Sequence, residues 1–418
     1  MLQQLNRHLG VFGVIVLLAS LALAGDDTAR PKIRAITGFV DLDAKNYAAE
    51  LQESVTFLNQ ARDAYQKAGW VVSGVRITTQ PFPEYTRGLS HDDAMILLRN
   101  LSDLAGKLKF GMNIGPAMVK DGDDTKSVDL LAEALSMGLR FNGNLITAAD
   151  DGIHWNAVKQ AARLIKYVSE HSPKGQGNFN FGAIAMMKPY GPFYPGSYSG
   201  GGRHFAIGLE GASVVAEVFA KEHDPQAAEH ALSAELARHL VEVEKIATKI
   251  AASNKDWIYS GIDPTPAPLG DDSIGTAIES FIGGPFGSSG TETASAIITR
   301  AVQSVPVKRT GYSGLMIPVL EDNTLTKRWG EGTYTLDSIL AYSAVCAGGV
   351  DTVPLPGDVT EERLARIIGD VATLAFKWNK PLAARLLPSP GRKVGEMTEF
   401  GGQLRNTIIQ PLSGSPSK

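Results

Sequence analysis

The stretch that decides the fold reads Arg309-Thr-Gly-Tyr-Ser-Gly-Leu-Met-Ile-Pro-Val-Leu-Glu-Asp322, then Val345-Cys-Ala-Gly-Gly-Val-Asp-Thr-Val-Pro-Leu-Pro-Gly-Asp358, then Asn379-Lys-Pro-Leu-Ala-Ala-Arg385. In each piece a short apolar run stops at glycine, proline or charged residues. Such runs are typical of buried strands in an α/β fold, whose ligands usually bind in loops at the carboxyl ends of strands. The pieces therefore predict strands at residues 315–320, 350–355 and 383–387, with a candidate pocket beside them.

Outward from this region, strand-like and helix-like segments alternate along the chain. Further strands are expected at residues 33–42, 71–79, 110–117, 140–147, 179–187, 204–209 and 257–262, with helices between them. This alternation predicts an α/β fold with a largely parallel sheet of about ten strands covered by helices. No composition break divides residues 25–402, so one domain is expected there. A frayed polar tail is expected at residues 403–418.

Composition narrows the class of partner. The chain has 418 residues, 44% of them apolar, which is enough for a large core. Its 40 basic and 44 acidic residues give no strong field for nucleic acid. The single cysteine, Cys346, excludes an intramolecular disulfide and a zinc site built from paired cysteines.

The first 24 residues have the parts of a secretory signal. Arg7 precedes an apolar run over residues 9–24, and Ala22-Leu-Ala24 fits a small-residue cleavage site before Gly25. We expect residues 1–24 to be a signal peptide and the protein to be exported, to the periplasm or outside the cell. A membrane anchor or a buried first helix is the alternative. No later segment is long and apolar enough to span a bilayer, so no stable membrane anchor is expected after cleavage.

Three motifs carry a resemblance to a known family: Arg34-Ala-Ile-Thr37, Asp263-Pro-Thr-Pro-Ala-Pro268 and Asp272-Ser-Ile-Gly275. With the carboxyl-terminal stretch above, they make the chain similar to family 711 of the domains of unknown function, also catalogued as uncharacterised protein family 0210. The resemblance implies a single large barrel of about ten mostly parallel strands surrounded by helices, like that of pyruvate formate-lyase. A shared fold does not imply a shared function, so this resemblance by itself predicts no activity.

The resemblance to pyruvate formate-lyase does not imply glycyl-radical chemistry. Such enzymes need a glycine in a motif near the carboxyl end and a cysteine on a central loop. Here the similar residues 309–314 lie far from the end, and Cys346 is expected in a turn between a helix and a strand. We therefore expect no glycyl radical.

Three carboxylates stand at or near the ends of predicted strands. Asp263 precedes three prolines within residues 264–268, which stiffen its loop. It suits a general acid, a general base or a metal ligand, or else a turn cap. Glu321 and Asp322 share a divalent ion only if their strand has already ended, since neighbours in a strand point to opposite faces.

Arg385 lies inside an apolar run, where a buried arginine needs an anionic partner. Asp351, Glu321 or a ligand carboxylate could supply that partner. Asp358 follows a strand and either belongs to a site or caps the next helix. In a parallel barrel the carboxyl ends of all strands lie on one side, so we expect these groups to meet Asp263 in one cleft.

The sequence thus predicts an exported enzyme that acts on a small anionic molecule by acid–base or metal-assisted chemistry. The candidate catalytic residues are Asp263, Glu321, Asp358 and Arg385. The candidate cofactor is a divalent metal ion, with Asp263, Glu321 and Asp322 as candidate ligands. A non-catalytic extracytoplasmic protein that binds a ligand in the same pocket is the alternative. The expected partner is a small molecule, and a homo-oligomer is left open.

Overall fold

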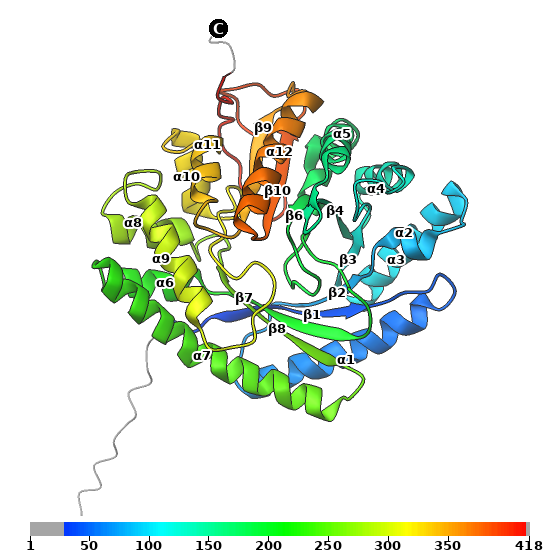
Figure 1. Cartoon of the computed structure of the whole chain (residues 1–418), viewed down its shortest axis with the longest axis horizontal. Helices are drawn as coiled ribbons and strands as arrows, with labels where there is room; N and C mark the ends of the chain where they lie inside the picture. The colour runs from blue at the N-terminus through cyan, green and yellow to red at the C-terminus, as the bar shows by residue number, and fades with distance from the viewer. Residues whose placement is uncertain (1–28, 415–418) are drawn as a thin grey trace, which may run out of the picture.

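A computed structural model of the chain describes residues 29–414. Its centre is a mixed, mostly parallel ten-stranded sheet surrounded by helices, which confirms the expected α/β class (Figure 1). The strands are β1 (Lys32–Val40), β2 (Val75–Thr79), β3 (Gly111–Pro116), β4 (Asn142–Ala149), β5 (Gly152–Ile153), β6 (Phe181–Ala185), β7 (His204–Glu210), β8 (Ile258–Ala267), β9 (Gly349–Pro356) and β10 (Leu382–Ser389).

The sheet consists of two sets of strands that run in opposite directions. Its order is β8-β7-β1-β2-β3-β4-β6-β10-β9, with β5 paired to β4. Strands β1, β2, β3, β4 and β6 run parallel. Strand β7 pairs antiparallel with β1, and β10 antiparallel with β6. Strand β8 pairs parallel with β7, and β9 pairs parallel with β10. These four strands therefore run opposite to the first set, and the expectation that the carboxyl ends of all strands lie on one side is wrong. The carboxyl end of β7, at Glu210, pairs with Lys32 at the amino end of β1.

Helices connect the strands and cover the outside of the sheet (Figure 1). Six of the helices in the described residues begin at a residue whose side chain accepts a backbone hydrogen bond, as Ser90 does from Asp93 N at 3.1 Å and Thr360 from Arg363 N at 3.2 Å. The helices are α1 (Tyr47–Lys67), α2 (Phe82–Thr86), α3 (His91–Leu108), α4 (Lys126–Ser136), α5 (Trp155–His171), the 3-10 helix η1 (Pro173–Asn180), α6 (Ala212–Phe219), α7 (Pro225–Ser253), α8 (Ile274–Ile282), α9 (Thr291–Ser304), α10 (Asn323–Glu331), α11 (Leu336–Tyr342) and α12 (Glu361–Trp378).

Residues 309–322 form an extended connection, which we call the bridging segment, and not the strand expected at 315–320. Arg309 makes an isolated parallel bridge to Ile262 in β8, and Pro318 makes one to Asp351 in β9. A continuous ladder is interrupted because Pro318 has no N–H to donate. The bridging segment therefore lies beside both edge strands of the sheet, β8 and β9.

The connection between β6 and β7, residues 186–203, packs against one face of the sheet. The carbonyl oxygen of Pro195 accepts hydrogen bonds from Asn113 Nδ2 at 2.8 Å and from Asn144 Nδ2 at 2.7 Å. Ser197 Oγ lies 3.0 Å from Thr78 Oγ1. Buried polar side chains of β2, β3 and β4 thus hold this β6–β7 loop in place, as buried polar groups require partners.

Residues 403–414 pack onto the domain, whereas a frayed tail was expected at residues 403–418; residues 415–418 lie outside the described part of the chain. Leu404, Ile409 and Leu412 are buried, and Arg405 N donates a hydrogen bond to the carbonyl of Leu320 at 2.8 Å. Apolar residues spaced through a polar sequence anchor residues 403–414 onto the domain.

The expected signal peptide, residues 1–24, lies outside the described residues. Between residues 29 and 414, no helix has the length and apolar character of a membrane span.

Candidate functional site

A cavity of about 160 Å³ opens where the two sets of strands meet the bridging segment, and we call it the inner cavity. Its floor and walls come from the amino-terminal parts of β1, β2 and β4, from the end of β8, and from β9, β10, the bridging segment and the β6–β7 loop. The charged residues that line it are Arg34, Arg76, Glu321, Asp351 and Arg385.

Arg385 lies between two carboxylates. Its Nη1 is 3.0 Å from Glu321 Oε1 and 2.8 Å from Asp351 Oδ1. Its Nη2 donates to the carbonyl oxygen of Phe179 at 2.9 Å, and the guanidinium lies 4.7 Å from the centre of that ring. All three charged residues are buried, with 6–8% of each whole residue exposed. The buried Nε of Arg385 has no hydrogen-bond partner among residues 29–414.

The pKa values of this cluster are shifted by burial and by the pairing of two carboxylates with one arginine. Burial raises the pKa of Asp351, and the neighbouring charge of Glu321 raises it further, against the attraction of Arg385. Burial alone lowers the pKa of Arg385, but the attraction of Asp351 and Glu321 exceeds this effect and the pKa is raised. Asp351 is therefore the carboxylate in the cavity that accepts a proton more readily than usual, while Arg385 stays charged.

Arg76 differs from the other two arginines because no carboxylate pairs with it. Arg34 Nη1 lies 2.8 Å from Glu210 Oε2. Arg76 donates only a long hydrogen bond, 3.4 Å, to the carbonyl of Pro192, and its guanidinium lies 4.8 Å from the ring centre of Tyr194. Burial lowers the pKa of Arg76 to about 10, so the group still carries its charge at neutral pH. Within the described chain this is a cation at the cavity wall without an ion-pair partner.

The rest of the lining is mixed: the amide side chains Asn142, Asn180 and Gln403 and two tyrosines lie beside apolar residues. Phe193, Met316 and Ala383 contribute apolar surface. Burial and the charge of Asp351 raise the pKa of the Tyr312 phenol, which keeps its hydroxyl as a neutral donor. No hydrogen bond joins the Tyr312 hydroxyl to another residue in the range 29–414. The cavity thus combines a free cation, a proton acceptor and a free hydroxyl with a short apolar wall.

Asp263 does not line the inner cavity and does not end its strand, because β8 continues to Ala267. Its buried carboxylate accepts hydrogen bonds from Thr265 Oγ1 at 2.6 Å, Tyr312 N at 2.7 Å and Ser313 N at 3.0 Å. Burial raises its pKa to about 6, against these hydrogen bonds. Asp263 holds the backbone that carries Tyr312, so it positions the cavity wall.

Asp322 and Asp358 also lie outside the inner cavity. Asp322 is the N-cap of α10, where it accepts from Leu325 N at 3.0 Å, and it also accepts from Ile274 N at 2.7 Å in α8. Its carboxylate therefore joins two helix N-termini. Asp358 is exposed, and Thr360, not Asp358, caps α12.

The expected metal ligands do not come together. Glu321 pairs with Arg385 in the cavity, whereas Asp263 and Asp322 are each occupied by hydrogen bonds in separate turns. In the described part of the chain, no three His, Cys, Asp or Glu side chains are grouped to hold a metal ion.

The structure brings Glu321 and Arg385 together and adds three lining residues that sequence reasoning did not select. Arg34, Arg76 and Tyr312 were passed over, although Arg34 and Arg76 interrupt apolar strands just as Arg385 does. An arginine inside an apolar strand was the signal that could have found both.

Comparison with known proteins identifies the family. The family model described as "Uncharacterised ACR (DUF711)" matches residues 27–406. A UPF0210 protein of Pyrobaculum aerophilum is 30% identical over 380 residues, which cover 85% of this chain and 83% of the relative. A UPF0210 protein of Listeria monocytogenes is 28% identical over 352 residues, covering 79% and 77%. One of Actinobacillus succinogenes is 30% identical over 299 residues, covering 69% and 64%. These matches confirm the expected resemblance: the chain belongs to the DUF711 family, together with the UPF0210 proteins.

Proposed function

We propose that the inner cavity binds a small molecule with a single anionic group, most simply a short carboxylate, and exchanges a proton with it. The observation that carries this proposal is Arg76, whose charged guanidinium lines the cavity without a carboxylate partner. A buried or half-buried cation is stabilised by an opposite charge, and a carboxylate fits the planar guanidinium through two parallel hydrogen bonds.

The charge balance of the cavity supports a monoanion. With Glu321 and Asp351 ionised, Arg385 and Arg76 bring the sum to zero, and Arg34 is balanced by Glu210 outside. A bound anion adds one negative charge. Because the pKa of Asp351 is already raised, this carboxylate is the group that takes up a compensating proton.

The size of the cavity restricts the ligand. A volume of about 160 Å³ is close to that of an engineered apolar protein cavity of about 150 Å³ that binds benzene. The apolar wall formed by Phe193 and Met316 faces the same space. A carboxylate with a short apolar body, such as propionate, satisfies both limits.

The chemistry that follows is acid–base. The proton moves between an Oδ atom of Asp351 and the bound molecule, while Arg385 keeps the other carboxylate, Glu321, in place. The Tyr312 hydroxyl is available to donate a hydrogen bond to an oxygen on which charge develops. The alternative is a binding protein that uses Arg76 and the same cavity without a chemical step. A proton exchange at Asp351 that accompanies turnover distinguishes the enzyme from the binder.

Two further proposals concern the context of the site. We propose that the bridging segment closes the sheet between β8 and β9 into a barrel similar to that of pyruvate formate-lyase, supported by its bridges to both strands. We also propose that the protein works after export, supported by the charged and apolar order of residues 1–24.

Calorimetric titration with propionate and related short carboxylates tests the proposed function. The variant Arg76→Met should weaken binding about tenfold to a hundredfold, as expected for loss of a hydrogen bond to a charged group. Arg366→Met, an exposed arginine of α12 away from the cavity, is the matched control and should bind like the wild type. Equal affinities of the Arg76 variant and the wild type, or no binding of any short carboxylate, would contradict the proposal. Native mass spectrometry of protein purified from its own host then identifies a retained ligand.

A further inference from the structure

The inner cavity offers more hydrogen-bond acceptors than the binding of a carboxylate requires. Glu321 Oε1 accepts from Arg385, whereas Glu321 Oε2 accepts no hydrogen bond from the described part of the chain. Asn142 donates from Nδ2 to the carbonyl oxygen of Met112 at 3.3 Å, but its Oδ1 accepts none from the described residues. The side chain of Asn180 makes no hydrogen bond with them either. Glu321 and both asparagines line the cavity, and none of these free oxygens is completely enclosed, so a donor on a bound molecule can reach them.

The free acceptors and the unpaired cation Arg76 approach the inner cavity from different parts of the sheet. Arg76 belongs to β2, whereas Glu321 lies in the bridging segment beside β9, at the edge of the sheet. With Asp351 and Arg385, Glu321 forms a cluster of two carboxylates and one guanidinium, which leaves one net negative charge. The cavity is therefore positive on the side of β2 and negative on the side of the bridging segment.

The charges on the two sides of the inner cavity are close enough to act on each other. Burial is the largest effect on Arg76 and lowers its pKa, while the charge of Glu321 shifts that pKa in the opposite direction. Both side chains line the same volume of about 160 Å³. A small molecule in this volume therefore meets an unpaired cation and a carboxylate oxygen that is free to accept.

A small amino acid matches this arrangement, because it carries one charge of each sign at neutral pH. Its ammonium group has N–H donors and no acceptor, so it requires oxygen atoms such as Glu321 Oε2, and hydrogen bonds between charged groups are the strong ones. Its carboxylate fits the guanidinium of Arg76. The sum of charges in the cavity then stays at zero, since the ammonium group supplies the positive charge that a proton on Asp351 supplies for propionate.

Building on the function proposed for the inner cavity, we propose that its ligand is a small amino acid, with the carboxylate on Arg76 and the ammonium group on Glu321 Oε2. Asn142 and Asn180 offer further amide oxygens to the ammonium group. Alanine and β-alanine keep the carbon skeleton of propionate and add one amino group, so both satisfy the size limit of the cavity.

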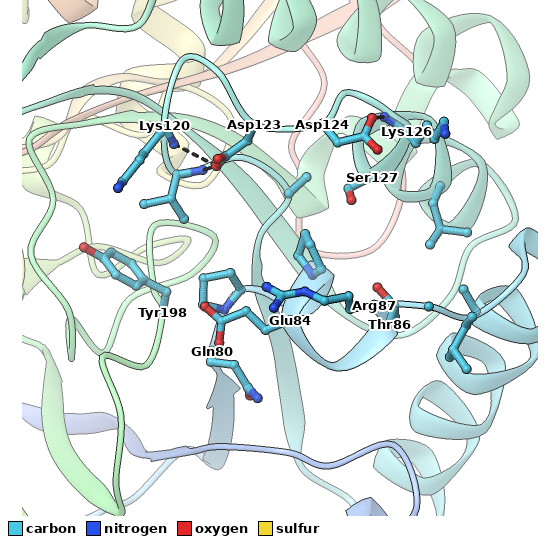
Figure 2. A pocket seen from close by; sticks show the side chains of 18 of the residues that line it. Gln80, Glu84, Thr86, Arg87, Lys120, Asp123, Asp124, Lys126, Ser127 and Tyr198 are labelled. Atoms are coloured by element: carbon cyan, nitrogen blue, oxygen red, sulfur yellow. Dashed lines mark hydrogen bonds between the residues drawn. The ribbon is translucent and has the colours of Figure 1, made fainter.

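A larger concavity, of about 1090 Å³, lies at the carboxyl ends of β1, β2 and β3, and we call it the outer cleft. Figure 2 shows Glu84 and Arg87 on one of its walls and Lys120 and Lys126 on another. Its lining carries more carboxylates than cations and shares no residue with the inner cavity. Glu84 is exposed, and its side chain makes no hydrogen bond or ion pair within residues 29–414. Glu84→Gln therefore removes a carboxylate from the outer cleft alone and is the matched control.

Calorimetric titration of the wild type with propionate, alanine and β-alanine tests the assignment. At least one of the amino acids should bind about tenfold or more tightly than propionate, because its ammonium group adds a hydrogen bond between charged groups. Glu321→Gln keeps the shape of the side chain and removes its charge, so this preference should fall below about threefold. Glu84→Gln should keep the preference, and Arg76→Met should weaken binding of the amino acid.

Proton uptake by the wild type gives a second readout that needs no variant. In two buffers of different ionisation enthalpy, binding of propionate should take up a fraction of one proton. Binding of the preferred amino acid should take up less, because its own ammonium group balances its carboxylate. Equal proton uptake with the two ligands would count against an ammonium group in the inner cavity.

A preference for an amino acid that is lost in Glu321→Gln and kept in Glu84→Gln supports the assignment. Binding of propionate that depends on Arg76, with neither amino acid bound more tightly, would overturn it and leave the function proposed for the cavity intact. No binding of any of the three ligands would contradict both. A preference that survives in Glu321→Gln, or that is lost in Glu84→Gln, would place the ammonium group elsewhere. Thermal denaturation of each variant checks that a loss of binding is not a loss of fold.

Discussion

Replacing Arg385 by methionine removes the only cation that touches both buried carboxylates of the inner cavity among the described residues. Glu321 and Asp351, at 3.0 and 2.8 Å from its Nη1, have side chains only 11% and 10% exposed. Breaking a buried pair in this way costs about 3–5 kcal/mol, because an uncompensated buried charge remains. The unfolding entropy is about 2.1 cal/mol/K per residue, for roughly 390 residues. Dividing the loss of stability by this entropy gives a fall of about 4–6 °C in melting temperature.

The stability that Arg385→Met loses should be larger at high pH than at low pH. The folded-state pKa of Asp351 is raised, and removal of Arg385 raises it further. The folded state then binds more protons than the unfolded state, so stability falls as the pH rises from the unfolded pKa through the folded one. Arg385→Met should therefore be less destabilising at pH 5.5 than at pH 8, and Asp351→Asn in the same chain should recover part of the loss.

Thermal denaturation followed by circular dichroism at the two pH values measures both effects. Arg300→Met is the matched control, since Arg300 pairs with Glu229 at 2.7 Å but its side chain is 55% exposed, and such surface pairs contribute about 0–1 kcal/mol. A loss of stability in Arg385→Met that is no larger than in Arg300→Met, or that is the same at both pH values, would refute this role of Arg385.

Three further outcomes are expected. Cys346→Ser should leave stability and propionate binding intact, since the thiol is fully buried and burial raises its pKa; native protein should not react with a thiol reagent, and a loss of binding at unchanged melting temperature would contradict this. Asp263→Asn should lower the melting temperature, because one carboxylate oxygen that accepts from backbone N–H groups is lost, and a variant with unchanged stability but abolished chemistry would instead make Asp263 catalytic. Amino-terminal sequencing of the native protein should begin at Gly25, and an intact Met1 would contradict export.

The fold class was predictable from the sequence because local patterns carry it. Apolar runs and capping residues such as Ser90 and Thr360 gave most strands and helices within a few residues of their observed bounds. The antiparallel pairings of β1 with β7 and of β6 with β10 were not predictable, because strand direction depends on contacts far apart in the chain. The bridging segment resembles a strand in sequence because it contains a short apolar run. In the structure it forms only isolated bridges, since Pro318 has no N–H for a regular ladder of hydrogen bonds.

The candidate site was predictable in part, for a related reason. The sequence indicates Arg385 because an arginine inside a buried strand needs an anionic partner, and Glu321 because it is a carboxylate at the end of a predicted strand. The two side chains form an ion pair in the structure. Asp263 and Asp322 look the same in sequence but accept backbone hydrogen bonds at turns and helix caps. Arg76 belongs to a distant strand, and its place at the cavity depends on the sheet order.

Calorimetric titration of propionate in two buffers of different ionisation enthalpy tests the central claim most directly, because it measures proton uptake on binding. If Arg76 binds the anion and Asp351 balances its charge, binding by the wild type takes up a fraction of one proton, and affinity rises as the pH is lowered. In Asp351→Asn binding should persist without proton uptake. Identical proton uptake in the two proteins, or binding with no proton uptake in either, would contradict the account.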